Sequence, residues 1–566
     1  MLMENTLRTT WSEAKLRAKD YKDDESGSLI IFSMFIFFTM IIFSGIAVDM
    51  MLYENERTNI QNSTDRAVLA AANLNQTVDP KLVVIDYLAK VGVAVDPDDI
   101  DVEEVGTAPV ITGRQVAVNV SSNYDTILMG MVGVDSLPYS AVSEAEEAIN
   151  DIEVSLVLDV SGSMGWNDKM PRLKTAAKDF VTGVLAGATD NRVSLSLVPY
   201  STQVAVGDDL LNLMNMDQEH NWSNCANFEN DDMFETVAMN HDTALKQTAA
   251  FDPWRSWRYG NAANPLLNEV CRTEAYMDIL PWSNNITTVN DQIDDFEAGG
   301  NTSIDVAFKW GTALLDPSMS AQLVALEGAG AEIDEEFVVR PHAHDYQDGL
   351  KFIVVMTDGI NTNQYYMKDS FKTGSAHRPG LPAARYYLRL SDQSVWMQAP
   401  EIGDRDGDGV FLEPWYNLSE REWDTFYVDD EQTEPGDNAF AGVNPDPTYV
   451  QVLDWLDFWP RVTVARYAYA EYHQTWDADD YWDNRNEPYS YVNASDKDDR
   501  LADVCTAAKD EGIIVFTIGF EVTDHSAGVM RSCASTPNHF YRVEGLDIEY
   551  AFASIKNQIN QLKLTQ

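Results

Sequence analysis

The sequence predicts a large α/β protein with a membrane-spanning helix near its start. Four apolar, β-branched runs are typical of strands buried on both faces of a sheet: EVSLVLDV, RVSLSLVPYS, KFIVVMTD and IIVFTIGFEV. Helix-like stretches such as IDVAFKWGTALL and DRLADVCTAAKDEG lie between them. Because buried strands alternate with helices, we expect a parallel sheet. An uncharged run of 21 residues near the start predicts the membrane helix.

The composition indicates a folded and strongly acidic protein. Of the 566 residues, 45% are hydrophobic and 11% aromatic, which is enough to build a large core. There are 91 Asp and Glu residues against 39 Lys and Arg, a net charge of −52. This balance argues against direct nucleic-acid binding, which requires a basic face. It favours divalent cations, basic partners or a salty medium outside the cytoplasm, although we expect most acids to form a solvated surface.

The run Ser28–Val48 (SLIIFSMFIFFTMIIFSGIAV) is predicted to be an uncleaved membrane anchor. A helix of this length spans about 30 Å, the thickness of a bilayer core. A cleaved signal peptide is the alternative, but the run is too long and no small-x-small cleavage site closes it. Five Lys and Arg residues precede Gly27 and two follow within 26 residues of Val48. We therefore assign 1–26 to a cytoplasmic tail and 27–48 to the transmembrane helix.

Residues 49–150 are predicted to form an α+β stalk. A helix continues from the anchor to about Leu74. A second helix is expected at Pro80–Val91, because proline suits a first helical turn. Alternating segments such as QVAVNVSS then predict strands.

Residues 151–566 are predicted to form one parallel-sheet domain with two long insertions, at about 204–279 and 361–496. Each insertion follows the carboxyl end of a predicted strand, the edge at which open parallel sheets bind ligands. The second insertion carries half of the 14 tryptophans, from Trp396 to Trp482. We expect these to form a core of its own, with a partner-binding surface as the alternative.

Four cysteines agree with an oxidising compartment. They are Cys225, Cys271, Cys505 and Cys533, and no C-x-x-C motif occurs among them. Three pairings are compatible with the sequence. We favour Cys225–Cys271 and Cys505–Cys533, because each pair lies within one segment of the chain.

The first buried strand ends in Asp159–Ser163 (DVSGS), which carries short oxygen-bearing side chains at alternating positions. On a strand-end loop, such side chains can converge on one hard cation. Two hydroxyls and one carboxylate do not complete an octahedral shell, so neighbouring strand ends must add ligands. The candidates are Thr302, in a glycine-rich loop that enters a helix, and Asp358, at the tip of another buried strand. Ser303 is an alternative to Thr302.

This D-x-S-x-S…T…D set resembles the metal-ion-dependent adhesion site of von Willebrand factor A (VWA) domains. The resemblance implies a doubly wound, Rossmann-like parallel sheet. It also implies that the hydroxyls of Ser161, Ser163 and Thr302 bind Mg²⁺, or Mn²⁺ or Ca²⁺. Asp159 and Asp358 would act through water and by orienting hydroxyls. In this family the sixth coordination position of the metal ion is left to water or to an acidic side chain of a partner.

Several longer segments resemble one subfamily. They are DESGSLIIFSMF, AVDMMLYENERTNIQNSTDRAVLAAA, TSIDVAFKWGTALLDP, LADVCTAAKDEGIIVFTIGF and IKNQINQLKLTQ. They resemble the TadG family, the VWA-containing proteins of tight-adherence (Flp) pilus machinery in Gram-negative bacteria. The resemblance implies a single-pass protein of the bacterial inner membrane with its bulk periplasmic or surface-exposed. It implies a non-enzymatic role in assembly and adhesion, through binding to other pilus-assembly or envelope proteins.

Two other functions compete with this interpretation. A free-standing VWA adhesin would bind host or matrix ligands through the same metal site. A serine hydrolase would use Ser163, because Ser161–Gly165 nearly matches the G-x-S-x-G nucleophile elbow and His525 and His539 follow late in the chain. The hydrolase interpretation leaves the other oxygen-bearing residues of the motif without a role, so we favour binding over catalysis.

A second candidate cation site is the segment DRDGDGVFLE in the second insertion. Its D-x-D-x-D-G start matches a calcium loop, which makes Asp404, Asp406 and Asp408 candidate Ca²⁺ ligands. The twelfth position is Trp415 rather than Glu, so Glu413 would have to close a shortened loop. An Asp/Gly-rich turn is the alternative.

Overall fold

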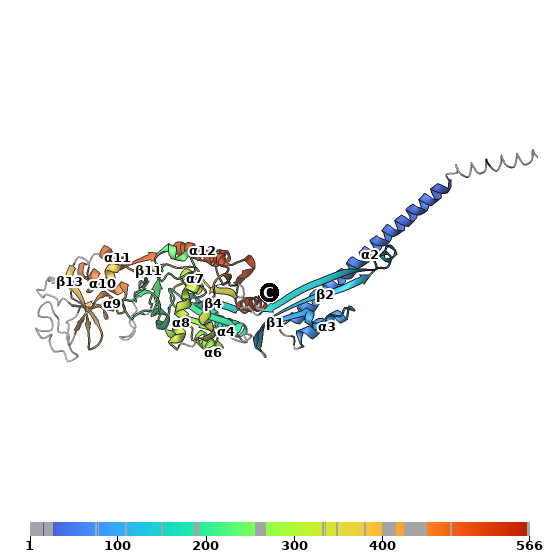
Figure 1. Cartoon of the computed structure of the whole chain (residues 1–566). Coiled ribbons are helices and arrows are strands. Elements are labelled where there is room, and N and C mark those ends of the chain that lie inside the picture. The colour runs from blue at the N-terminus through green and yellow to red at the C-terminus, as the bar shows by residue number, and fades with distance from the viewer. Residues whose placement is uncertain are drawn as a thin grey trace, which may run out of the picture. The chain divides into compact units, whose positions relative to one another are not determined.

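The computed structural model forms two compact units, one of residues 1–149 with 564–566 and one of residues 150–563 (Figure 1). The residues that the structure describes are 15, 26–73, 76, 78–107, 110–148, 151–185, 192–254, 266, 268–330, 333, 335–346, 349–378, 381–398, 415–423, 450–475 and 478–562.

The first unit consists of a long helix, a short helix and a three-stranded antiparallel sheet in the order β1-β2-β3. The Asp79 carboxylate caps the short helix by accepting a hydrogen bond from the Lys81 backbone N–H. The elements are α2 (Ser26–Ala72), α3 (Pro80–Ala89), β1 (Ile100–Thr107), β2 (Val110–Asp125) and β3 (Ser136–Ala148).

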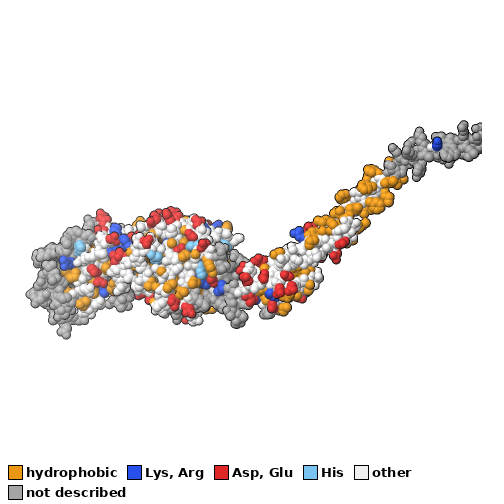
Figure 2. Space-filling model, in the orientation of Figure 1, with side chains coloured by type: hydrophobic (Ala, Val, Ile, Leu, Met, Phe, Trp, Pro, Cys, Tyr) orange, Lys and Arg blue, Asp and Glu red, His pale blue; other side chains and the backbone are white. Residues whose placement is uncertain are grey.

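The long helix α2 has an exposed apolar part and a part packed on the sheet. Hydrophobic side chains cover the visible face of its apolar part (Figure 2), and by length and composition the helix can cross a membrane. Further along, Ala67 and Ala71 are buried in a core with Val84 of α3 and Val118 of β2. The exposed apolar part and the packed part therefore belong to one continuous helix.

The second unit is built on a six-stranded sheet in the order β20-β19-β10-β4-β5-β9. All neighbouring pairs are parallel except β5 and β9, which are antiparallel. The prediction of a parallel sheet is therefore wrong at this edge. A parallel partner requires a crossover connection, whereas the chain returns to β9 directly from the first insertion. The strands are β4 (Asp151–Asp159), β5 (Val193–Tyr200), β9 (Leu280–Ser283), β10 (Gly349–Thr357), β19 (Ile514–Phe520) and β20 (Phe540–Val543).

Helices cover both faces of this sheet. Leu156 and Leu158 of β4 pack into a core with one group of helices, while Val157 between them packs into the opposite core. Burial on both faces explains why the strands are continuous apolar runs. The first group is α4 (Lys169–Leu185), α6 (Ile286–Asp294) and α14 (Asp547–Leu562), and the second is α7 (Ile304–Ala313), α8 (Ser320–Gly328) and α12 (Ala494–Asp510).

The two insertions lie after β5 and β10 and share a hydrophobic core. Phe251 and Val270 of the first insertion belong to the same buried cluster as Trp455 and Trp459 of the second. These tryptophans are therefore core residues, but their core is shared with the first insertion, so for them the prediction that the second insertion has a core of its own is wrong. The first insertion contains α5 (Asp208–Leu211), β6 (Met216–Asp217), β7 (Ala226–Asn227) and β8 (Leu245–Gln247). The described strands and helices of the second are β11 (Gln364–Met367), β12 (His377–Arg378), β13 (Leu381–Arg389), β14 (Val395–Gln398), β15 (Trp415–Asn417), β16 (Glu422–Trp423), β17 (Val450–Val452), α9 (Trp455–Phe458), α10 (Val464–Thr475), α11 (Ala478–Asn486) and β18 (Tyr489–Val492).

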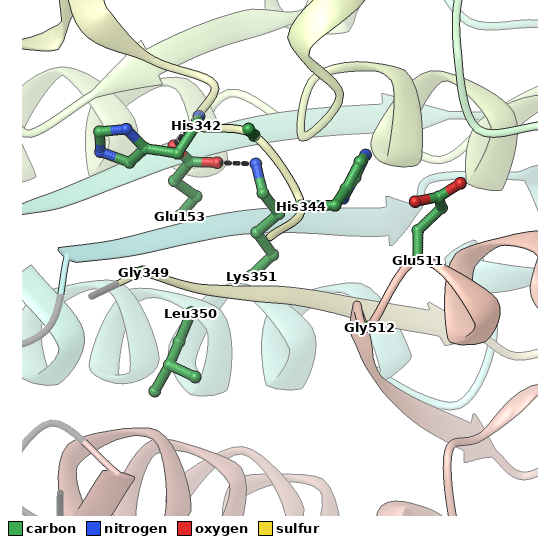
Figure 3. A pocket seen from close by; sticks show the side chains of 9 residues that line it. Glu153, His342, His344, Gly349, Leu350, Lys351, Glu511 and Gly512 are labelled. Atoms are coloured by element: carbon green, nitrogen blue, oxygen red, sulfur yellow. Dashed lines mark hydrogen bonds and ion pairs between the residues drawn. The ribbon is translucent and has the colours of Figure 1, made fainter. Parts of the chain in front are cut away.

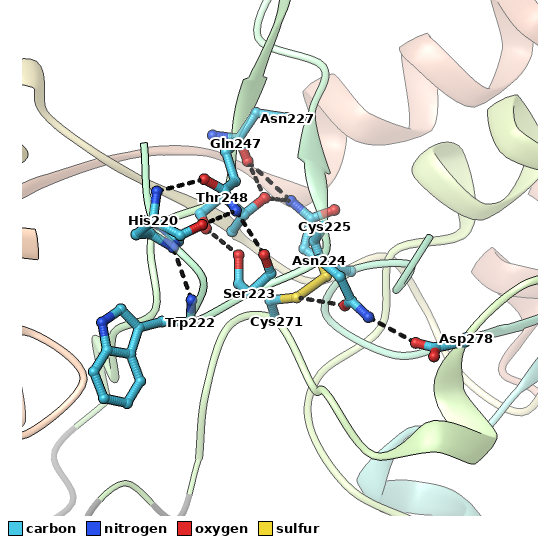
Figure 4. Close-up of a disulfide and its surroundings, with 11 residues drawn as sticks. His220, Trp222, Ser223, Asn224, Cys225, Asn227, Gln247, Thr248, Cys271 and Asp278 are labelled. Atoms are coloured by element: carbon cyan, nitrogen blue, oxygen red, sulfur yellow. Dashed lines mark hydrogen bonds between the residues drawn. A yellow bond between two sulfur atoms is a disulfide. The ribbon is translucent and has the colours of Figure 1, made fainter. Parts of the chain in front are cut away.

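The cysteines pair as Cys225–Cys271 and Cys505–Cys533, the pairs favoured above. The first disulfide lies within the first insertion, among polar side chains that hydrogen-bond to one another (Figure 4). The second joins α12 to α13 (Asp524–Cys533). Each bond therefore closes a loop within the second unit.

Candidate functional site

The side chain of Asp159 fixes the loop that follows β4. It is fully buried, and its Oδ1 accepts a hydrogen bond from the Ser161 backbone N–H at 2.8 Å. Its Oδ2 accepts a hydrogen bond from the Thr357 hydroxyl, on the neighbouring strand β10, at 2.9 Å. With the loop held in this way, Ser161 Oγ lies 3.1 Å from Ser163 Oγ.

Asp358, the residue after β10, faces the same loop. Its Oδ1 accepts a hydrogen bond from Ser163 Oγ at 2.6 Å, and its Oδ2 forms an ion pair with Lys169 Nζ at 2.9 Å. The Lys169 and Asp358 side chains are 8% and 0% exposed, and the Glu521 carboxylate lies 3.9 Å from the same ammonium group. The Lys169 ammonium group therefore supplies a buried positive charge within the site.

Lys169 was not recognised in the sequence. It is the first residue of α4 and lies six residues after Ser163. That short spacing was the signal available, because a helix that starts so soon after a strand-end loop directs its first turn back toward the same edge of the sheet.

The glycine-rich loop before α7 packs directly on the loop after β4. The Gly162 N–H donates to the Gly300 carbonyl at 2.9 Å, and the Gly299 N–H donates to the Val160 carbonyl at 2.9 Å. Gly300 has a φ of +78°, and a Cβ there would lie 3.0 Å from the Ser201 hydroxyl. Only glycine suits both the backbone conformation and this close approach.

Thr302 and Ser303 differ in where their hydroxyls point. A Cβ built on Gly359 would lie 3.7 Å from Thr302 Oγ1 and 3.9 Å from Ser163 Oγ, so these two hydroxyls border the same small space. Ser303 Oγ instead lies 2.7 Å from the Thr202 carbonyl and accepts a hydrogen bond from Lys497 Nζ at 2.6 Å. Of the two candidates, Thr302 is the one placed beside the serine loop.

The structure thus brings Asp159, Ser161, Ser163, Thr302 and Asp358 together from three loops at the carboxyl edge of the sheet. Burial, and then the charge of Asp358, raise the pKa of Asp159 to about 7. Among the described residues, no group of three or more His, Cys, Asp or Glu side chains could hold a metal ion. The donors here are two carboxylates and three hydroxyls, all oxygen atoms, which is the chemistry that hard cations prefer.

The first insertion reaches this site through Arg272, the residue after Cys271. Its guanidinium donates to the carbonyls of Glu297, at 3.0 Å, and Gly299, at 3.3 Å. A hollow of about 360 Å³ lies beside these residues and is also lined by Glu269. Burial, and then the charge of Glu274, raise the pKa of Glu269 to about 7. The rim of the site is therefore formed partly by the insertion.

The opposite edge of the sheet holds a smaller cavity of about 40 Å³ (Figure 3). Lys351 Nζ lies 2.6 Å from Glu153 Oε2, and the His342 backbone N–H donates to Glu153 Oε1 at 2.9 Å. The Lys351–Glu153 ion pair therefore joins the starts of β4 and β10 beside this cavity.

The two histidines considered for a hydrolase interact elsewhere. The His525 ring hydrogen-bonds to Asp498 at 2.8 Å, and the His539 ring packs edge-on against Phe516. The hydrogen-bond partners of Ser163 Oγ are Asp358 and Ser161. The arrangement around Ser163 is that of a carboxylate and hydroxyl cluster.

The candidate calcium loop at 404–413 lies outside the described residues.

Residues 27–74 match a family model described as putative Flp pilus-assembly TadE/G-like. No curated protein matches the chain. The N-terminal helix is thus similar to the corresponding segment of TadE/G-like pilus-assembly proteins.

Several solved structures of pilus proteins show a distant similarity. The vWF domain of the type V pili tip protein Mfa5 from Porphyromonas gingivalis has 14% identity and a TM-score of 0.31, covering 74% of this chain and 98% of that one. The pilus adhesin SpaC from Lactobacillus rhamnosus GG has 13% identity and a TM-score of 0.28, covering 83% and 36%. The pilus adhesin RrgA from Streptococcus pneumoniae has 14% identity and a TM-score of 0.28, covering 82% and 48%. These TM-scores are too low to establish a shared fold.

Proposed function

We propose that the protein is a non-enzymatic, membrane-anchored component of a Tad (Flp) pilus system that binds an acidic group of a partner protein through a metal-ion-dependent adhesion site. The match of residues 27–74 supports the pilus system. The observation that carries the adhesion site is the convergence of the Ser161, Ser163 and Thr302 hydroxyls beside Asp358. The charge bias around the anchor supports a cytoplasmic N-terminus in the bacterial inner membrane, with the bulk of the chain outside the cytoplasm.

Each residue of the site has a distinct task in this proposal. The hydroxyls of Ser161, Ser163 and Thr302 would hold Mg²⁺, or Mn²⁺ or Ca²⁺, and Asp358 would orient Ser163. Asp159 orients the loop through its bonds to the Ser161 N–H and to Thr357. Bound at these neutral oxygens, the cation would supply an electrophilic position that a partner carboxylate can occupy.

Asp159→Ala and Ser161→Ala test this function. Both variants should lose Mg²⁺ binding by the full chain in calorimetry, because each removes one element of the oxygen set, while circular dichroism stays unchanged. Ser532→Ala is the matched control, since the Ser532 hydroxyl bonds only locally, to the Val529 carbonyl on α13. Mg²⁺ binding that persists in both site variants would contradict the metal site.

The partner can be identified by cross-linking in the native envelope followed by mass spectrometry. Magnesium-dependent cross-links to pilus-assembly proteins are expected, and Asp159→Ala should abolish them. Cross-links that survive both EDTA and this substitution would show that the metal does not mediate the contact. Binding restricted to matrix proteins would instead support the free-standing adhesin.

A further inference from the structure

A short uncharged loop at one end of the first unit carries a cluster of exposed apolar side chains. It joins β2 to β3 and has the sequence TILMGMVGV, between Asp125 and Asp135. Large apolar residues scattered singly on a surface need no explanation, whereas a contiguous cluster indicates an interaction site. The exposed side chains are Ile127 at 67%, Leu128 at 37%, Met131 at 73% and Val132 at 46%.

The loop is fixed to the helix α2 at the end of its apolar run. The Asp49 carboxylate, the first charge after that run, accepts hydrogen bonds from the backbone N–H groups of Ile127, Leu128 and Met129, at 3.0, 2.8 and 2.6 Å. On the helix, a Cβ added at Gly45 would lie 2.9 Å from the Cβ of Leu128. The loop therefore lies beside residues 45–49 of α2.

The hydrogen bonds to Asp49 compensate for the loss of water around a carboxylate at the end of the apolar run. A carboxylate at this level is costly unless donors compensate for the loss of water. Asp49 is fully enclosed, and the three loop N–H groups supply those donors. Val48 and Met51, which flank Asp49 in the sequence of α2, are themselves exposed.

We propose that the loop at 126–134 inserts into the lipid bilayer interface beside the helix α2. The inference rests on the proposed membrane anchoring of α2 and adds a second point of contact. A helix from Leu29 to Val48 spans about 30 Å, so residues 45–49 lie at one boundary of the bilayer core. Ile127, Leu128, Met131 and Val132 then meet acyl chains and headgroups, while the two flanking aspartates remain in water.

Lipid is the occupant that these observations favour. The apolar cluster lies beside residues 45–49, directly after the exposed apolar run of α2, at the level where a helix of this length leaves the bilayer. Two contacts with the membrane, one through the helix and one through the loop, restrict both the tilt and the rotation of the first unit. A single helix would leave rotation about its own axis free.

Spin labelling of the full chain in phosphatidylcholine nanodiscs tests the inference. All four cysteines are in disulfides, so one introduced cysteine is the only free thiol to label. Met131→Cys places the label on the loop, and the high exposure of Met131 makes the change tolerable. Phe35→Cys is the control within the anchor. Glu103→Cys is the aqueous control, because Glu103 pairs with Gln115 in the sheet, about 30 Å along β2 from the loop.

The label at residue 131 should be several-fold more accessible to oxygen, relative to a water-soluble nickel chelate, than the label at residue 103. It should approach the ratio found at residue 35. A label at 131 in water beside a label at 35 in lipid would overturn the inference and assign the loop to a protein partner. Labels at both 35 and 131 in water would show that the anchor itself is wrong, which is a separate failure.

Discussion

Lys169→Met is the substitution that most directly probes the electrostatics of the candidate site. The Lys169 ammonium lies 2.9 Å from a carboxylate oxygen of Asp358, and both side chains are almost fully buried. Asp159 and Glu521 also lie close to this ion pair. Methionine retains the apolar length of lysine and removes only its charge, so the variant leaves a cluster of carboxylates without their cation.

The cost can be estimated from the burial of the pair. Removing one partner of a buried ion pair destabilises a protein by about 3–5 kcal/mol, because the remaining charge is uncompensated. The free energy of unfolding of Lys169→Met in EDTA should fall by about that amount. Mg²⁺ at the neighbouring hydroxyls would replace the lost positive charge. Saturation at 100 times the dissociation constant stabilises a protein by about 2.7 kcal/mol. Since Mg²⁺ should bind the variant more tightly than the wild type, the variant should gain more from it.

Urea unfolding of the full chain in detergent, followed by tryptophan fluorescence, measures both effects. Each protein is unfolded once in EDTA and once in excess Mg²⁺. Lys169→Arg is the matched control, because it keeps the charge beside Asp358 and should remain close to the wild type. Equal stability of Lys169→Met and the wild type in EDTA would refute the buried ion pair. An equal gain from Mg²⁺ in the two proteins would refute the placement of the cation beside Asp358.

Two further predictions concern packing and pH. A Cβ on Gly311 of α7 would lie 2.7 Å from Val157 Cγ2 and 2.8 Å from Ile353 Cδ1, so Gly311→Ala should destabilise the protein by about 1–3 kcal/mol in urea unfolding, and an unchanged midpoint would contradict this packing. Burial, and then the charge of a nearby lysine, lower the pKa of His220 to about 4, and its neutral Nδ1 accepts a hydrogen bond from the Trp222 N–H at 3.2 Å. The unfolded chain protonates His220 near pH 6.5, whereas the folded chain does so only near pH 4. Between these two values protonation favours the unfolded chain, so the free energy of unfolding should decrease by at most about 3 kcal/mol as the pH falls from 6.5 to 4. The contribution of His220 should not change with pH above 6.5 or below 4. His220→Asn, which keeps an acceptor but does not titrate, should flatten that pH profile, and identical profiles would contradict the assignment.

The elements that the sequence predicts well are those whose pattern has one physical cause. EVSLVLDV and KFIVVMTD are continuous apolar runs because helices cover both faces of the sheet. The five oxygen-bearing residues of the candidate site were likewise identifiable, because carboxyl ends of parallel strands meet at one edge. Three of the five lie within Asp159–Ser163, and this short spacing leaves little freedom in how the loop can fold.

The elements that were missed depend on long-range contacts. In the aromatic stretch at 450–459, the chain forms a strand, β17, and a short helix, α9. A short apolar run is compatible with either a helix or a strand. Here Val450–Val452 form a strand because they pair with β13. Asp496 and Asp499 are exposed, whereas Lys497 between them is fully buried and lies 3.4 Å from Asp305 of α7. Its position on the inner face of α12 cannot be predicted from local charge.

The first insertion is best understood as part of the candidate site. Cys271 is disulfide-bonded, and the adjacent Arg272 donates to two carbonyls in the loop that leads to Thr302. The insertion therefore supports the loop that presents the threonine hydroxyl, and its guanidinium places a positive charge on an otherwise acidic rim that includes Glu269. In the proposed function, a partner carboxylate would bind close to this rim. If the proposed function holds, the insertion would contribute to selection among partners, and the loops at the sheet edge would supply the oxygen ligands.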